Sequence, residues 1–192
     1  MQCLSSHPSI LTVSCCRGIT KCLSMNSEAP YSFLGPSAAG PSSWDMSWRL
    51  QLTKNLEVLT RQLWHAGIRE IFVDGSFAED KDHPDDVDGY FVCSLDQLRS
   101  GELARQLNLL DPFKIWTWDP STRKPYRGYP KKQLPMWHRY RVELYPHVPG
   151  LGSGSGIREK YGHEHEFPSA FLQSRRDGKP KGIVRIRYGG ET

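Results

Sequence analysis

A glycine-serine pair and two closely spaced aspartates are the residues of this sequence best suited to chemistry. Gly75 and Ser76 follow an apolar, strand-like run, and nine residues separate Ser76 from Asp86. A small pair at that point lets main-chain N–H groups approach a phosphate, and the serine hydroxyl adds a donor. Asp86 and Asp88 lie two positions apart, so in a strand both carboxylates project from one face, about 6–7 Å apart. Hard oxygen ligands beside a phosphate-binding turn predict a site for a nucleotide with Mg²⁺ or Mn²⁺.

A third carboxylate is expected from a neighbouring strand. Glu143 is the best candidate, because it lies between Val142 and Leu144 in an alternating, strand-like run. An acid among apolar neighbours is costly unless it is paired or bound to a metal.

The order of these residues resembles the polymerase-beta-like nucleotidyltransferase superfamily, and more narrowly a family of small bacterial and phage proteins of that fold. The resemblance covers roughly residues 44–187. The matching segments are Asp74-Gly75-Ser76, Asp86-Val87-Asp88, Glu143, Leu144-Tyr145-Pro146 and the C-terminal run Asp177-Gly178-Lys179-Pro180-Lys181-Gly182-Ile183.

The resemblance implies that Gly75 and Ser76 hold a nucleoside triphosphate and that Asp86, Asp88 and Glu143 are catalytic and bind metal. The implied reaction moves a nucleoside monophosphate from an NTP to an acceptor hydroxyl on RNA, a protein or a small molecule. The third acid of such sites is often Asp, and Glu143 is one methylene longer. A toxin or phage-defence role with an antitoxin partner also follows by resemblance alone. The alternative is a catalytically inactive nucleotide- or RNA-binding protein of the same fold.

The acidic loop has two other interpretations. As a calcium loop it fails, because aligning Gly89 with the required glycine places Pro84 and Leu95 at the first and last ligand positions. As a solvated turn it would have a structural role only, with the aspartates capping the loop. The run His163-Glu164-His165-Glu166 is not the zinc motif HExxH and is better explained as the exposed start of a helix.

Charge is distributed unevenly along the 192 residues. The formal net charge is +4, but residues 44–120 carry 8 basic and 14 acidic side chains, whereas residues 121–192 carry 15 basic and 6 acidic ones. In the basic half, positive side chains alternate with aromatic ones, a mixture that suits phosphate contact and base stacking. RNA such as tRNA is therefore a candidate partner, although a solvated positive surface explains the same pattern. The residues concerned are Lys124, Tyr126, Arg127, Tyr129, Lys131, Lys132, Trp137, Arg139, Tyr140 and Arg141.

Residues 1–43 differ in composition from the rest of the chain. They contain three charged residues and no sustained periodicity, so we expect a disordered or loosely attached N-terminal extension before a nucleotidyltransferase-like domain over residues 44–192. Four of the five cysteines lie in the first 22 residues without a disulfide or zinc pattern, while Cys93 is a candidate core residue. No run approaches the ~18 apolar residues of a membrane helix. These features favour a cytoplasmic protein without a membrane partner.

Helical and strand-like patterns alternate over residues 44–146, which predicts an α+β (α/β) fold with a small mixed sheet flanked by helices. Leucines at three- and four-residue intervals predict a helix with Ser43 as N-cap and Gly67 as its end. A second helix is expected over residues 95–110 and a third over 161–174. Strands are expected over residues 68–74, 87–93, 113–118, 140–145 and 181–188, with a long loop over 119–136.

Overall fold

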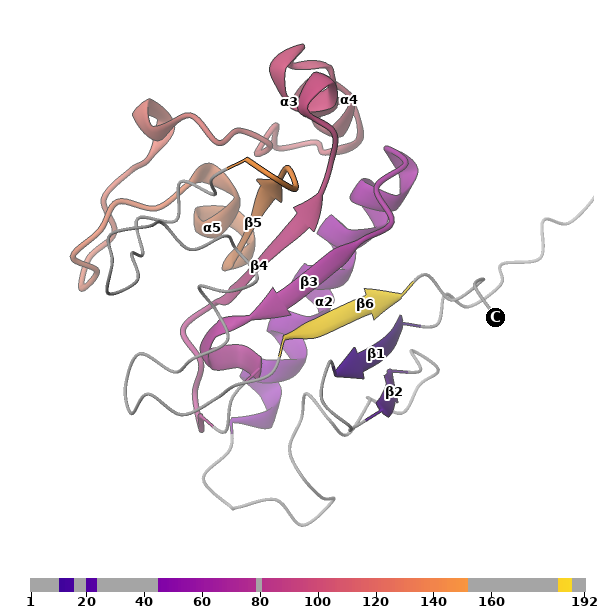
Figure 1. The fold of residues 1–192 in the computed structure, drawn as a ribbon. Helices are drawn as coiled ribbons and strands as arrows, with labels where there is room; N and C mark the ends of the chain where they lie inside the picture. The colour runs from indigo at the N-terminus through magenta and orange to yellow at the C-terminus, as the bar shows by residue number, and fades with distance from the viewer. Residues whose placement is uncertain (1–10, 16–19, 24–44, 79–80, 152–182, 188–192) are drawn as a thin grey trace, which may run out of the picture.

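The computed structural model describes residues 11–15, 20–23, 45–78, 81–151 and 183–187. Within these ranges, six strands form a mixed sheet in the order β2-β1-β6-β3-β4-β5 (Figure 1). β4 and β5 run parallel, and the other neighbouring strands pair antiparallel. The expected α+β fold with a mixed sheet and flanking helices is confirmed. The strands are β1 (Leu11–Cys15), β2 (Thr20–Leu23), β3 (Ile71–Asp74), β4 (Val87–Val92), β5 (Val142–His147) and β6 (Val184–Arg187).

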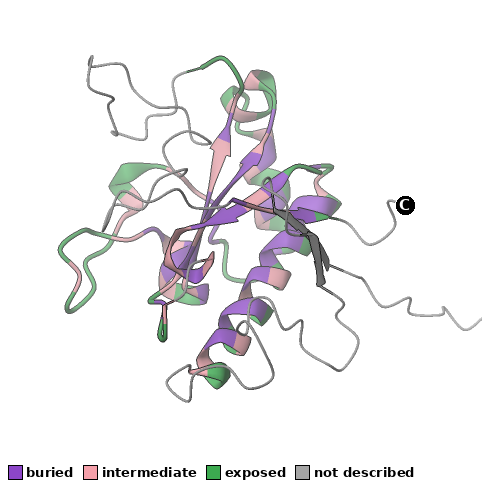
Figure 2. Cartoon of the chain, turned by 60° about the horizontal axis from the view of Figure 1, so that its bottom comes forward, coloured by how far each residue is buried: buried purple, intermediate pink, exposed green. Residues whose placement is uncertain are grey.

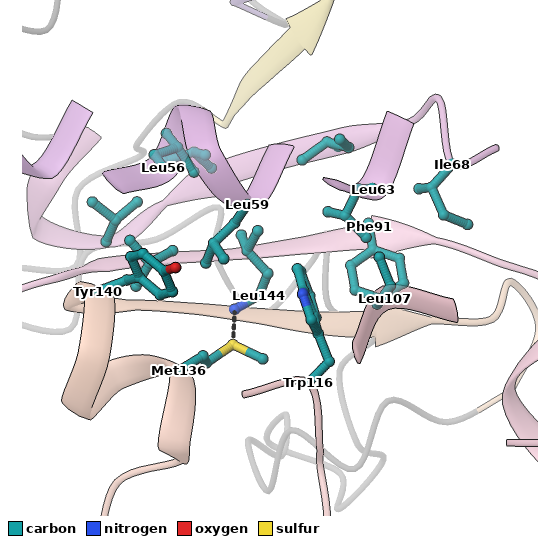
Figure 3. Close-up of a cluster of buried hydrophobic side chains, with 14 of the residues drawn as sticks. Leu56, Leu59, Leu63, Ile68, Phe91, Leu107, Trp116, Met136, Tyr140 and Leu144 are labelled. Atoms are coloured by element: carbon teal, nitrogen blue, oxygen red, sulfur yellow. Dashed lines mark hydrogen bonds between the residues drawn. The ribbon is translucent and has the colours of Figure 1, made fainter. Parts of the chain in front are cut away.

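The long helix α2 (Met46–His65) supplies most of the leucines that pack on the sheet. Figure 3 shows Leu59 beside Leu144 and Leu63 beside Phe91, and Leu56 belongs to the same cluster. All five side chains are buried, so the predicted apolar stripe is core. Figure 2 shows that the side of α2 that faces the sheet is buried, whereas parts of its opposite side are exposed.

The ends of α2 differ in how well the sequence predicted them. Asp45, rather than the predicted Ser43, is the N-cap, and its side chain accepts a hydrogen bond from the main-chain N–H of Trp48 at 2.9 Å. The helix ends at its C-cap Ala66, and Gly67 follows with a φ of +85°, as predicted for a glycine stop.

The single helix predicted over residues 95–110 is two helices, α3 (Leu95–Arg99) and α4 (Glu102–Leu110). Gly101 separates them with a φ of +69°, a left-handed conformation that interrupts a right-handed helix. The leucine spacing predicted one continuous helix, although Gly101 lies at the position where it is interrupted.

The strand predicted over residues 113–118 is wrong. The side chain of Asn108 binds the main chain of Trp116 on both sides, accepting from its N–H at 2.9 Å and donating to its carbonyl at 2.8 Å. An amide side chain thus takes the hydrogen bonds that a neighbouring strand would have formed.

The loop predicted over residues 119–136 contains more regular structure than expected. It holds the short 3-10 helix η2 (Pro120–Thr122), and helix α5 (Pro135–Tyr140) begins at its end. Tyr140 therefore belongs to a helix, and β5 starts two residues later than predicted because Arg141 takes a left-handed φ of +55°.

Part of the predicted N-terminal extension adds to the sheet. β1 pairs with β2 on one side and with β6 on the other, where Val13 lies opposite Ile186. These nine residues of the predicted extension therefore pair within the sheet. The remainder of residues 1–43 lies outside the described ranges, as do the predicted helix over 161–174 and the His163–His165 run.

Two further observations concern Cys93 and the apolar character of the helices. Cys93 is buried, as expected for a small core residue. Across the described part of the chain, no helix has both the length and the apolar character needed to cross a membrane.

Candidate functional site

Three acidic residues lie side by side on β3, β4 and β5, the three strands at one edge of the sheet. Asp74 of β3 is directly opposite Asp88 of β4, and Asp88 is directly opposite Glu143 of β5. Residues paired in this way project to the same face of a sheet, and neighbouring strands lie about 4.8 Å apart. Val87 and Leu144, which alternate with these acids, belong to the core. The acids therefore lie on the face opposite α2, and the structure brings the predicted Asp88 and Glu143 together.

Asp74 was named only as the residue before the glycine-serine pair, but it belongs to this row. Its side chain is fully buried at the end of β3. Its position in the motif gave a signal, since it ends the strand immediately before the Gly-Ser pair.

The Gly-Ser turn lies against this row of acids. The 3-10 helix η1 (Gly75–Ala78) follows β3 directly. Gly75 has a φ of +71°, and a Cβ atom placed on it would lie 2.9 Å from Oδ2 of Asp88. Both the backbone angle and the close approach require glycine at this position. Ser76 is half-buried beside it.

A buried arginine of α2 holds the segment that follows the turn. The guanidinium of Arg49 donates to the carbonyl oxygens of Phe77 at 3.1 Å and Lys81 at 2.5 Å. It also lies over the Phe77 ring, 5.6 Å from the centroid. Arg49 was not singled out from the sequence. Its position three residues before Leu52, on the apolar stripe, was the signal that could have identified it.

Asp86 precedes β4 and is half-buried. Its Oδ2 accepts a hydrogen bond from the indole Nε1–H of Trp137 at 2.7 Å. Burial is the main cause that raises the pKa of Asp86, and the negative charges of Asp85 and Glu143 raise it further, partly offset by the Trp137 bond. A carboxylate in an environment this negative is stabilised by a cation.

Glu143 is buried and already has partners on both carboxylate oxygens. Oε1 accepts from the main-chain N–H of Leu134 at 2.9 Å, and the Tyr145 hydroxyl donates to Oε2. The guanidinium of Arg123 lies 3.7 Å from Oε1 and donates to the Tyr145 hydroxyl at 2.7 Å. Glu143 is therefore fixed in position by three groups. From the sequence, Tyr145 was named only as part of the Leu144-Tyr145-Pro146 match, and none of the three was paired with Glu143.

The basic and aromatic segment is packed largely against itself. Arg141 lies over the ring of Trp137 at 3.8 Å and that of Tyr126 at 4.2 Å. Tyr126 and Tyr129 contact Trp137 edge-on, with centroids 5.0 and 4.8 Å away. Trp137 is fully buried, so it offers no free face for a base. Of these rings, Tyr126 is exposed.

Comparison with known proteins places the chain in a family. A model described as a family of unknown function, DUF6932, matches residues 27–187. The chain belongs to the DUF6932 family. No curated protein and no solved structure matches it. The match begins within the predicted extension and includes the Gly-Ser turn and all of the acids described above.

The donor set of this DUF6932 chain fits a magnesium-nucleotide better than an all-protein metal centre. Within the described residues, no three His, Cys, Asp or Glu side chains are grouped so as to hold a metal ion. Mg²⁺ is commonly bound by one or two carboxylates together with substrate phosphates. Asp88 lies against the Gly-Ser turn and Asp86 is two positions before it, whereas both oxygens of Glu143 already accept hydrogen bonds.

Proposed function

We propose that this protein is a nucleotidyltransferase that moves a nucleoside monophosphate from an NTP to an acceptor hydroxyl and releases pyrophosphate. The observation that supports this most directly is the contact between Gly75 and the carboxylate of Asp88. It brings a potential phosphate-binding turn against a potential metal ligand, and Glu143 is the next residue along the same row.

Each residue has a separate role in this proposal. Gly75 and Ser76 hold the triphosphate through the main-chain N–H groups of the turn and the serine hydroxyl. Asp86 and Asp88 hold Mg²⁺ or Mn²⁺, which supplies positive charge that offsets the phosphates and polarises the reacting oxygens. Glu143 accepts the proton of the acceptor hydroxyl, with Leu134 and Tyr145 fixing its orientation.

The proposal specifies the acceptor by its reacting group, a hydroxyl. RNA such as tRNA, a protein side chain and a small molecule all carry suitable hydroxyl groups. A cytoplasmic toxin or phage-defence role, controlled by an antitoxin protein, extends the proposal and rests on the sequence resemblance alone.

Label transfer tests the reaction. The protein is incubated with each α-³²P-labelled NTP, Mg²⁺ or Mn²⁺, and total RNA or cell lysate, and transfer is followed on gels. We expect labelled product with the wild type and none with the D86N/D88N double variant. D82N is the matched control, because Asp82 is an exposed acid of the same loop. Transfer that persists in the double variant would contradict the mechanism.

A second candidate function, nucleotide or RNA binding without chemistry, is favoured by one observation. Both oxygens of Glu143 have hydrogen-bond donors, as in a structural carboxylate. Isothermal titration with Mg²⁺-NTP separates the possibilities. Binding without transfer to any acceptor supports the binding protein, and transfer that is lost in E143Q while binding remains supports the enzyme. No binding at all indicates that the aspartates only cap the loop.

A further inference from the structure

Trp137 links the short helix α5 to the acid that precedes β4. The two residues are 51 positions apart, and the indole Nε1–H donates to Oδ2 of Asp86 at 2.7 Å. Trp137 is fully buried. A buried indole N–H needs a hydrogen-bond partner, and Asp86 provides it.

The Trp137 ring is held in place by its neighbours. The Arg141 guanidinium covers it at 3.8 Å, and Tyr129 and Tyr126 contact it edge-on. Cation–π and edge-to-face contacts of this kind stabilise one orientation of a ring. Three of the residues that suggested base stacking, Tyr126, Tyr129 and Arg141, therefore support a single indole.

The same segment also fixes the backbone that carries the acids. The carbonyl of Arg141 accepts from the N–H of Val87 at 2.9 Å, at the start of β4, and Leu134 donates to Glu143 on β5. Figure 1 shows α5 beside β5, near the end of the sheet where β4 and β5 begin. Two side-chain bonds and one main-chain bond thus connect residues 134–141 to the acid-bearing ends of two strands.

We propose that Trp137 is a positioning residue for Asp86: its indole N–H holds one carboxylate oxygen and leaves the other directed at a divalent cation. This inference rests on the proposed function, because it assumes that Asp86 binds metal. Hydrogen bonds from outer groups to metal ligands typically change affinity by 10- to 100-fold when they are removed. Trp137 contacts the ligand residue and not the cation, so its effect is on affinity and orientation.

The experiment measures Mn²⁺ affinity by electron paramagnetic resonance, with and without a non-hydrolysable NTP analogue. Trp137 is changed to Phe, and separately to benzothienylalanine, which replaces the indole N–H by sulfur with almost no change of shape. We expect both variants to bind Mn²⁺ about 10-fold or more weakly than the wild type. The second variant keeps the test valid if W137F does not fold.

Trp116 provides the matched control. It is also fully buried, and its indole N–H donates to the side chain of Gln62 at 2.6 Å, in a network with Asp111 rather than the candidate ligands. The same two changes at position 116 should lower thermal stability and leave Mn²⁺ affinity unchanged. Unchanged affinity in the position-137 variants overturns this inference while the proposed function stands. A wild type that binds no Mn²⁺, even with the nucleotide analogue, overturns the proposed function and this inference with it.

Discussion

A Cβ atom on Gly75 would lie 2.9 Å from Oδ2 of Asp88 and 3.3 Å from its Cβ. The turn and the acid therefore occupy fixed positions against each other, with no space for a side chain between them. In the proposed function this contact keeps the triphosphate and the cation at adjacent places.

Substitution of Gly75 by alanine tests this contact. The left-handed φ of +71° costs an alanine about 1–2 kcal/mol, and crowding against Asp88 adds about 1–3 kcal/mol. We expect G75A to lower the free energy of unfolding by both amounts and to lose Mg²⁺-NTP binding, as measured by urea unfolding and titration.

Gly128 provides the control for this change. It has a φ of +86° with nothing within 4 Å of its would-be Cβ. G128A should therefore show the backbone cost alone and normal nucleotide binding. Equal losses of stability in G75A and G128A would mean that the contact with Asp88 contributes nothing.

Arg49 is predicted to stabilise the segment after the turn. R49K cannot span both the Phe77 and Lys81 carbonyls with a planar fork, and a buried polar group left unsatisfied costs about 1–3 kcal/mol. We expect a loss of about 2 kcal/mol in urea unfolding together with weaker nucleotide binding. R61K alters an exposed ion pair with Glu57 on the same helix and should change stability by less than about 0.5 kcal/mol. Similar losses in the two variants would refute the anchoring role.

The raised pKa of Asp86 predicts a pH dependence of stability. Between the ordinary value of 3.8 and the raised value, the folded chain binds more protons than the unfolded chain. The contribution of Asp86 to stability is therefore complete below about pH 3.8 and is lost as the pH rises through the raised pKa. In EDTA at pH 7, D86N should be more stable than the wild type, since its amide oxygen can still accept the Trp137 bond.

Urea unfolding from pH 4 to pH 8 measures this effect, with D82N as the exposed control. Mg²⁺ should stabilise the wild type and have little effect on D86N, because it offsets a charge that the variant lacks. The idea fails if D86N is no more stable than the wild type at pH 7 in EDTA.

Gly89 sets how closely β3, β4 and β5 approach. A Cβ there would lie 2.3 Å from the carbonyl oxygen of Phe72 and 2.9 Å from Cδ2 of Leu144. Because the nearest atom belongs to the backbone, G89A requires the strands to separate, and we expect a loss of about 3 kcal/mol or more. Circular dichroism melting checks this, and a melting temperature within 2–3 °C of the wild type, roughly 1 kcal/mol, would contradict it.

Local patterns predicted the elements that carry the Gly-Ser turn and Asp88. Alternation around Val87 predicted β4, and leucine spacing predicted α2, because burial of one face leaves a period in the sequence. Helix α5 was missed since six residues are too short to show that period. The N-cap was also misplaced, because Ser43 and Asp45 are both suitable residue types.

Contacts between distant segments were beyond the reach of the sequence. No local pattern indicates that Trp137 would meet Asp86, or that Arg123 would lie beside Glu143, because these pairings depend on how distant segments fold together. The Tyr145 contact is local, since Tyr145 follows Glu143 by two positions on the same strand. The aromatic and basic composition was visible, but it did not distinguish rings packed on each other from rings open to a ligand.

The helix α2 carries a consequence for how the site can move. Arg49 binds the carbonyls after the Gly-Ser turn, and Asn55 donates to the carbonyl of Tyr140 at the end of α5 at 2.8 Å. The two anchors are six positions apart, which at 1.5 Å per residue is about 9 Å along the helix axis. Neither the turn nor α5 can therefore shift along α2 without breaking a hydrogen bond to it, so this one helix fixes the distance between the Gly-Ser turn and the end of α5.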